Sequence, residues 1–148
     1  DFVADDADDV LPRGPFDLIT LFGVLHHVPA LERRLRLVRA LASRLAPAGV
    51  LTLTFWRLHE DPRFERRRAS FAEHNLTTDD PIDEHDLEPG DVLLRWGQTR
   101  DATPLRYCHF SDDAEIAQLI GATSLAVHAR FRGDGRNDAL NEYVVLRA

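Results

Sequence analysis

The apolar residues of this chain fall into short continuous runs and longer periodic ones. Residues 17–22 form a short, mostly apolar run, as expected for a parallel strand covered on both faces. Residues 50–56 mix β-branched and aromatic side chains with alternating threonines, which predicts the next strand. Between them, apolar residues recur at helical spacing over residues 32–45, and charged residues fill most of the other faces. The pattern predicts strand, helix and strand, with Pro47 and Gly49 ending the helix.

The C-terminal part of the chain predicts a second helix followed by two strands. Ser111 is the expected N-cap, because acidic residues follow it near the positive end of the helix dipole, and Gly121 closes the helix. Residues 125–131 and 142–146 are the expected strands, and the turn-rich residues 132–138 connect them as a hairpin.

Two other regions are irregular. Residues 2–4 are expected to be the tail of a strand, followed by an acidic loop over residues 5–14. Residues 59–104 are polar, with a basic run at 66–68 and an acidic run at 79–84, and they contain no internal repeat. This stretch is interpreted as an insertion between the second strand and the second helix.

Composition narrows the class of protein. A chain of 148 residues that is 44% apolar can build one domain with a core. No apolar run approaches the ~20 residues that span a bilayer, so no membrane contact is expected. The single cysteine, Cys108, excludes an internal disulfide and fits a cytoplasmic location, while the net charge of -7 argues against general attraction to nucleic acid. Because the chain has no methionine and no signal peptide, it is expected to be part of a longer product.

The most informative motif joins the first strand to the helix. It reads Phe16-Asp17-Leu18-Ile19 and then Val24-Leu25-His26-His27-Val28-Pro29, which resembles the fourth strand and following turn of the class I S-adenosylmethionine (SAM) methyltransferases. The helix, the turn Ala46-Pro47-Ala48-Gly49 and the next strand keep that family's order. The resemblance implies an α/β, partial Rossmann-like class I methyltransferase fold, with a mostly parallel sheet and an antiparallel last strand. Residues 1–148 would be the C-terminal part of one methyltransferase domain, with an insertion at about 59–104.

In that family the cofactor, SAM, lies across the turn after the fourth strand. The glycine-rich loop and the ribose-binding acid of the family are not in this sequence, so a missing N-terminal half would supply them. For the acid that binds adenine, Asp6 before Ala7 is the better match and Asp5 the alternative, unless this segment is simply a solvated loop. Gly23 would permit close approach of the backbone to a ligand, or it is only a helix-entry turn. The implied cofactor-facing residues are Asp5, Asp6, Ala7, Leu21, Phe22, Gly23 and His26.

A narrower resemblance rests on five segments that occur in the same order. Residues 24–27, 32–34, 55–56, 90–96 and 106–110 are similar to segments of the tRNA wobble-uridine carboxymethyl methyltransferases. That family would esterify a carboxylate, which is ionised at neutral pH and needs no general base, so no catalytic residue is assigned. Arginine forks bind carboxylates and aromatic faces stack on bases, although such arginines are usually solvated and such aromatic residues usually belong to the core. The implied substrate-side residues are His27, Arg34, Trp56, Arg95, Trp96, Arg106, Tyr107 and His109.

The adjacent histidines allow two functional interpretations, a metal pair or an imidazole that orients the substrate. Neighbouring side chains diverge, and no Cys or carboxylate completes a metal set at a recognised spacing, so no metal is expected. One of His26 and His27 is expected to be a hydrogen-bonded core residue, and the other to face the site.

Departures from the family keep other functions open. Pro47-Ala48-Gly49 replaces the usual Pro-Gly-Gly, and Arg95 stands where a proline is expected. The acidic insertion would repel RNA, which weakens the case for a tRNA acceptor more than the case for methyl transfer itself, and a small-molecule acceptor is the alternative. A third hypothesis is a non-catalytic fragment that binds a partner protein, or the missing half, through an unpaired apolar edge at residues 17–22.

Overall fold

The computed structural model describes residues 11–96, 104–135 and 138–148, and its main element is a four-stranded sheet in the order β1-β2-β7-β6. The strands are β1 (Phe16–Leu21), β2 (Leu45–Trp56), β7 (Asn141–Arg147) and β6 (Ala126–Gly133). β1 pairs with β2 in parallel, and β7 is antiparallel to both β2 and β6. Three strands therefore share one direction and the last strand is inserted against them, which confirms the expected sheet.

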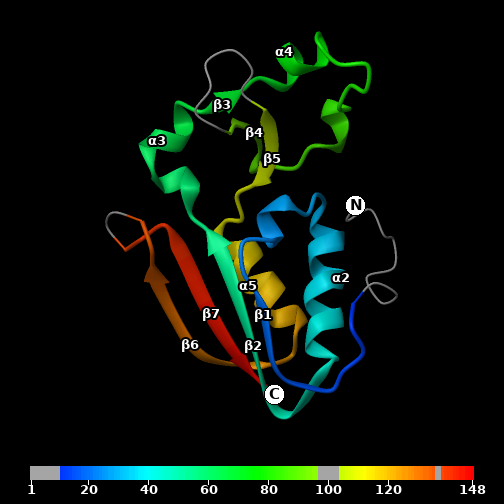
Figure 1. Ribbon diagram of the computed structural model, residues 1–148, viewed down its shortest axis with the longest axis vertical. Coiled ribbons are helices and arrows are strands. Elements are labelled where there is room, and N and C mark those ends of the chain that lie inside the picture. Colours follow the sequence, from blue (N-terminus) through cyan, green and yellow to red (C-terminus); the bar gives the residue numbers. More distant parts are fainter. Residues whose placement is uncertain (1–10, 97–103, 136–137) are drawn as a thin grey trace.

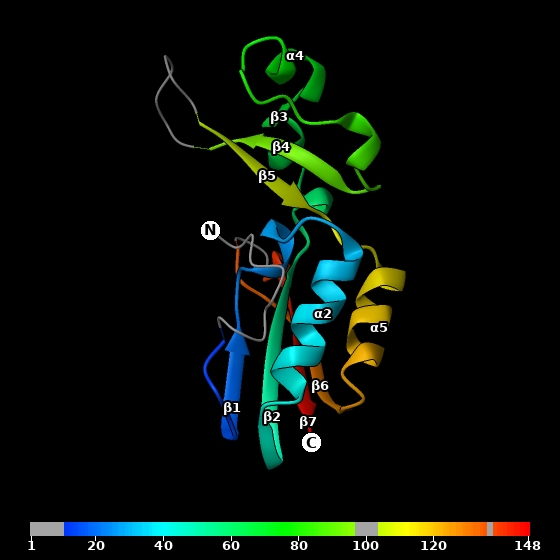
Figure 2. The same cartoon turned by 90° about the vertical axis from the view of Figure 1, so that its right-hand side faces the viewer.

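Two helices cover one face of this sheet (Figure 2). They are α2 (Leu31–Ala42) and α5 (Asp113–Ala122). Their apolar faces pack on the alternate residues of β2 and β7 that point toward them, such as Leu51, Leu53 and Val144. Shortening one of these buried leucines to alanine would cost about 2–5 kcal/mol of stability. The side chains of Leu18 and Phe131 lie on the other face and are exposed among the described residues.

The helix after β1 ends earlier than the sequence predicts, and β2 begins earlier. Helix α2 ends at Ala42, whereas the periodic pattern extends to residue 45. Leu45 instead pairs with Phe16, and the register then shifts so that Leu18 pairs with Val50. Pro47 and Gly49 were expected to end the helix, but they lie at an irregularity within β2. β1 and β2 are paired both before and after that irregularity.

Helix α5 also starts differently from the prediction. Its N-cap is Asp112, whose carboxylate accepts the backbone N–H of Glu115 at 2.8 Å. The hydroxyl of Ser111, the predicted cap, instead donates to the carboxylate of Glu115 at 3.1 Å. Ser111 thus holds the side chain of Glu115, in the first turn of α5, and does not cap the helix.

The stretch between β2 and α5 forms a second, smaller sheet in the order β3-β4-β5. Its strands are β3 (Arg68–Ala69), β4 (Asp91–Arg95) and β5 (Leu105–His109), all antiparallel. Short helices accompany it: η2 (Leu58–Glu60), α3 (Pro62–Glu65), α4 (Phe71–Asn75) and η3 (Glu84–Asp86). A separate apolar cluster that includes Leu58, Leu94 and Cys108 holds it together. Figure 1 shows this small sheet beyond the carboxyl end of β2, so it stands over the edge where parallel strands place ligands.

Among the residues that the structure describes, no helix has the length and apolar character needed to cross a membrane.

Candidate functional site

The chain makes a tight turn directly after β1. Gly23 has a φ of +67°, a conformation that glycine adopts at little cost, and a Cβ placed there would meet no atom within 4 Å. Its N–H donates to the hydroxyl of Thr54 at 2.9 Å, which fixes the turn to β2. The short helix η1 (Leu25–His27) follows at once. This turn exposes backbone at the carboxyl edge of the sheet, and the space above Gly23 is open.

Four predicted site residues stack into one layered group, here called the aromatic column: His26, Trp56, Trp96 and Arg106. The imidazole of His26 stacks on the indole of Trp56 with centroids 3.6 Å apart. Trp56 and Trp96 are parallel within 19° at 6.2 Å, and the guanidinium carbon of Arg106 lies 4.3 Å from the centroid of Trp96. Each layer comes from a different element or its end, so the column exists only because the small sheet stands over the main one.

The two histidines at the base of the column are held in the neutral form. Burial, followed by electrostatic interactions with His27 and Arg106, lowers the pKa of His26 to about 3. Burial also lowers the pKa of His27, with Arg106 adding to it and a hydrogen bond to the backbone opposing it. In that bond, 3.0 Å long, Nδ1 of His27 faces the carbonyl oxygen of Tyr107. Since a carbonyl only accepts, Nδ1 carries the proton and Nε2 keeps its lone pair.

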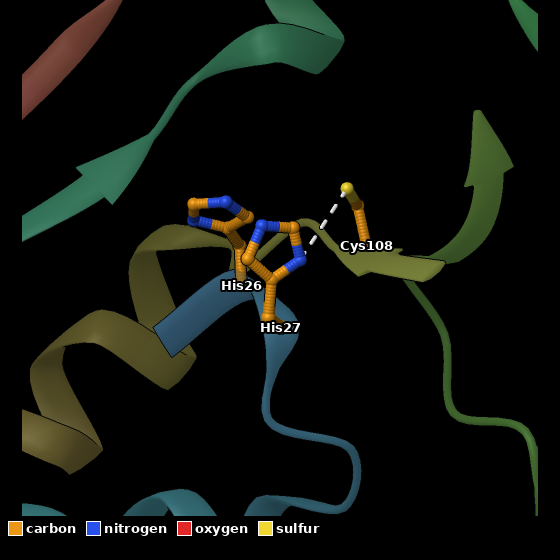
Figure 3. Close-up of side chains that lie close together, drawn as sticks. All are labelled: His26, His27 and Cys108. Atoms are coloured by element: carbon orange, nitrogen blue, oxygen red, sulfur yellow. Dashed lines mark hydrogen bonds between the residues drawn. The ribbon is translucent and has the colours of Figure 1, made fainter. Parts of the chain in front are cut away.

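Cys108 lies beside these histidines, although the sequence predicted no role for it. Its Sγ is 4.0 Å from Nδ1 of His27, and the three side chains are drawn together in Figure 3. The thiol is fully buried, and burial raises its pKa to about 11. The two segments are 81 residues apart in the chain, so no local spacing could have indicated the contact.

Five charged residues form a second group, the buried ion network: Arg34, Glu88, Asp91, His109 and Glu115. Arg34 has a side chain only 1% exposed and binds Glu88 and Glu115, each at 2.7 Å. His109 lies between Asp91 and Glu115, with both ring nitrogens 2.6 Å from a carboxylate oxygen. Because both nitrogens face acceptors, both must donate, and His109 is an imidazolium. A cavity of about 610 Å³ borders the network on the side of α5 and β4.

The pKa values of the network agree with this charge pattern. Burial alone would lower the pKa of His109, but the hydrogen bonds to Asp91 and Glu115 outweigh it and raise the pKa. Burial alone would raise the pKa of Glu115, but the bond from His109 and the charge of Arg34 lower it. The hydroxyl of Tyr107 donates to Asp91 at 2.7 Å; burial, followed by this bond, raises the pKa of Tyr107.

Two of the predicted substrate contacts have their polar groups engaged by other residues. The guanidinium of Arg34 is saturated by two carboxylates and the carbonyl of Val28, and His109 has no ring nitrogen to spare. Both residues therefore join α2, β5 and α5 instead of offering a free group to a substrate. Tyr107 likewise turns its hydroxyl to the network, and its backbone carbonyl alone faces His27.

The remaining predicted residues are scattered. Arg95 is exposed and donates to the carbonyl of Arg68, away from the column. Leu21 packs against the main core, and Phe22 is 52% exposed, with its ring edge-on to Tyr143 at 5.9 Å. The expected core histidine is His26, but neither of its ring nitrogens has a hydrogen-bond partner, so the predicted hydrogen bond is absent among the residues that the structure describes.

A few of the predicted contacts fall outside the described residues. The acids proposed for adenine, Asp5 and Asp6, and the neighbouring Ala7, belong to this set, as does the strand tail at residues 2–4. The acids Glu88 and Glu115 were not singled out as site residues, and only their ion pairs with the buried Arg34 reveal them, since arginines are rarely buried unless paired.

A family model described as a methyltransferase domain matches residues 1–130. The chain belongs to this family. Consistent with that, the fold of this methyltransferase domain resembles a SAM-dependent methyltransferase from Methanosarcina mazei, with a TM-score of 0.62 and 17% identity over 93% of this chain and 62% of that one. A S-adenosylmethionine-dependent methyltransferase from Clostridium acetobutylicum gives a TM-score of 0.58 at 10% identity, over 93% and 60% of the two chains.

One curated relative matches a shorter part of the domain. It is the mouse protein called probable tRNA methyltransferase 9B, which is 40% identical over 53 residues, or 35% of this chain and 12% of that protein. This methyltransferase domain therefore spans less than two thirds of the solved structures above and a small part of the mouse protein.

Proposed function

We propose that this protein is a SAM-dependent methyltransferase that esterifies a carboxylate on a modified uridine of tRNA. Membership of the methyltransferase family supports the reaction class. The observation that carries the choice of acceptor is the aromatic column, which combines two indole faces with a half-buried arginine at the carboxyl edge of the sheet.

The residues after β1 fit a cofactor lying across the turn. Gly23 leaves open space above its backbone, and Thr54 holds the turn in place. Leu21, Phe22, Gly23 and His26 stay proposed cofactor contacts, with Asp5, Asp6 and Ala7 the proposed contacts from the residues outside the described part. Bound SAM would supply an electrophilic methyl group on a sulfonium centre.

Arg106 is the residue that suits the acceptor carboxylate. Among the described residues it forms no ion pair, in contrast to Arg34 and Arg57, each of which pairs with at least two acids. Its guanidinium is held over Trp96, so little side-chain entropy remains to be lost when it binds a carboxylate in a fork geometry. A base attached to that carboxylate could stack on Trp56 or Trp96. The carboxylate is already ionised, so positioning is the main task of the protein.

Two observations favour tRNA over a free small acid. One is the similarity to the mouse protein, whose name includes tRNA methyltransferase. The other is the way charge is distributed on the small sheet: the basic residues extend from α3 to β3, and the acidic run lies between α4 and η3, on the other side of β3 (Figure 1). The acids that would repel RNA are thus separated from the arginines that could contact phosphates. The basic residues are Arg63, Arg66, Arg67 and Arg68.

The experiment is to incubate the full-length protein, including the N-terminal part expected to carry the glycine-rich loop, with SAM labelled in its methyl group and either bulk tRNA or a pool of small carboxylic acids. We expect label in tRNA that mild base releases as methanol, because a methyl ester is base-labile and an N- or C-linked methyl group is not. Base-stable label, or label only in small acids, would overturn the proposed acceptor. No label in any acceptor would overturn methyl transfer.

The variant Arg106→Gln tests the role of the arginine. Glutamine keeps hydrogen-bonding ability but removes the charge. We expect the rate of esterification to drop at least tenfold, which corresponds to the loss of about one charge-assisted hydrogen bond. The matched control is Arg147→Gln, since Arg147 is exposed at the opposite end of the sheet. Equal losses of esterification activity in both variants would show that Arg106 does not bind the acceptor.

A further inference from the structure

Three potential metal ligands meet at the base of the aromatic column. His26 and His27 come from η1 and Cys108 from β5, and one ligand atom of each lies within 4.8 Å of the others. Figure 3 shows the three side chains close together, with the ring of His27 between His26 and Cys108. Neutral imidazoles and a thiol are the donors that bind Zn²⁺, whereas Mg²⁺ and Ca²⁺ prefer oxygen.

His26 supplies a second and independent indication. Its side chain is 4% exposed, and both ring nitrogens are buried without a hydrogen-bond partner among the described residues. Buried polar groups are almost always satisfied, and leaving one unsatisfied costs about 1–3 kcal/mol. Stacking on Trp56 engages the faces of the ring but leaves its nitrogens, which lie in the ring plane, without partners. A bound ion in that plane would accept a lone pair from one of them.

The surroundings of His27 also suit a ligand. Its Nδ1–H donates to the carbonyl of Tyr107, which leaves Nε2 as the lone-pair donor. A metal-binding histidine commonly has its second nitrogen held by a carbonyl or carboxylate in this way, which fixes the tautomer and the ring orientation.

The distances require only small adjustments. Zn–S and Zn–N bonds of roughly 2.3 and 2.0–2.1 Å place tetrahedral ligand atoms roughly 3.3–3.6 Å apart. The ligand atoms of the three residues lie within 4.8 Å of one another, so side-chain shifts of about 1 Å bring the set to that range. The other acid and histidine cluster, Glu88, Asp91 and His109, is less suitable because His109 already donates through both nitrogens.

We propose that His26, His27 and Cys108 bind a Zn²⁺ ion, with a fourth position left for water or another ligand. Binding displaces the proton of the Cys108 thiol, so one proton is released per ion and affinity rises with pH. The expectation from sequence that no metal set exists depended on spacing along the chain, and β5 supplies the cysteine that spacing could not show. This site does not depend on the proposed methyl transfer.

The test is a titration of metal-free protein with Zn²⁺ in competition with a chromophoric chelator. We expect one ion per chain, and at least a hundredfold weaker binding in Cys108→Ser and in His26→Gln. The control is His85→Gln, because the side chain of His85 is 97% exposed and lies outside the cluster. Equal affinity of the wild type and the Cys108→Ser variant would overturn the proposal.

A measurement on the wild type covers the case in which a variant fails to fold. Cobalt substituted for zinc should give a thiolate-to-cobalt charge-transfer absorption, and X-ray absorption of the zinc form should show one sulfur and two imidazole ligands. A first shell without sulfur, or no bound metal at all, would contradict the site.

Discussion

The imidazole of His26 lies flat on the indole of Trp56, with centroids 3.6 Å apart and ring planes 19° apart. His26 follows β1 and Trp56 ends β2, so the contact joins the carboxyl ends of two adjacent parallel strands. Trp96 and Arg106, at the end of β4 and on β5, then extend the stack from the small sheet. One stacked group thus connects the main sheet with the small sheet.

The only two tryptophans of the chain are both in this stack, which gives it a direct spectroscopic signal. Parallel indoles 6.2 Å apart couple as an exciton pair, so we expect a couplet in the circular dichroism spectrum. Trp96→Phe should abolish the couplet while leaving the thermal unfolding transition within a few degrees, because Trp96 is only half-buried. A wild-type spectrum without a couplet would mean that the indoles do not stack in solution.

The bond between Gly23 and Thr54 can be tested by removing the acceptor. Thr54→Val keeps the shape of the side chain but leaves the N–H of Gly23 without its partner, so we expect a loss of about 1 kcal/mol in the free energy of unfolding. Thr52→Val is the matched control, since Thr52 lies on the same face of β2 two residues earlier and has no side-chain bond in the described part. Urea unfolding measures both, and a larger effect at Thr52 would refute the assignment.

The backbone at Gly23 makes a separate prediction. An added Cβ meets no neighbouring atom, so any cost of Gly23→Ala must come from the positive φ and should be about 1–2 kcal/mol. Gly121→Ala is the contrasting variant: its Cβ also meets nothing, but the residue lies in α5, where alanine is favoured by up to about 1 kcal/mol. Opposite signs for the two substitutions in urea unfolding are expected, and equal signs would argue against a left-handed turn.

Glu115 is the acid that the buried ion network shares between Arg34 and His109. Glu115→Gln removes a charge that two cations need, so we expect it to cost about 3 kcal/mol of stability at neutral pH. The control is Glu32→Gln, because Glu32 is exposed and its pair with Arg39 is 4.0 Å long, which predicts a change of about 0–1 kcal/mol. Comparable losses of stability in the two variants would show that the buried ion network does not stabilise the fold.

The same residue predicts the acid side of the stability profile. The folded-state pKa of Glu115 is lowered, so its contribution is complete above the unfolded value of about 4.3 and is lost as the pH falls through the folded pKa. The groups that face it are Arg34 from α2, His109 from β5 and Ser111 before α5. Between about pH 6 and pH 3, the free energy of unfolding should therefore fall more steeply in the wild type than in Glu115→Gln. Parallel curves would contradict this account.

The sequence predicted the elements whose pattern is long and regular. β1, α2, β2, α5, β6 and β7 all occur in the predicted order, because a covered sheet requires apolar runs and amphipathic helices. The start of β2 was missed since Pro47 and Gly49 are typical helix terminators, and only pairing with Phe16 reveals a strand there. β4 and β5 are five residues each, too short for their alternation to stand out within a polar stretch.

The candidate site was predicted as a set of residue types but not as a geometry. The members of the aromatic column could be predicted, because they are the histidine, tryptophans and arginine of the motifs. The role of Arg34 was not, because its acids lie 54 and 81 residues away and nothing local distinguishes it from a solvated helical arginine. Cys108 was missed for the same reason, since a partner 81 residues away has no spacing signature.

Strand β5 has a further consequence. Arg106 and Cys108 point to one face of it, toward the column and the histidines, while Tyr107 and His109 point to the other, toward the acids. A substitution at one of these four positions removes contacts on one face of β5 only. Insertion or deletion of a single residue would exchange the two faces and disable both at once. Natural variation of this protein should therefore tolerate changes of residue type in β5 far better than changes of its length.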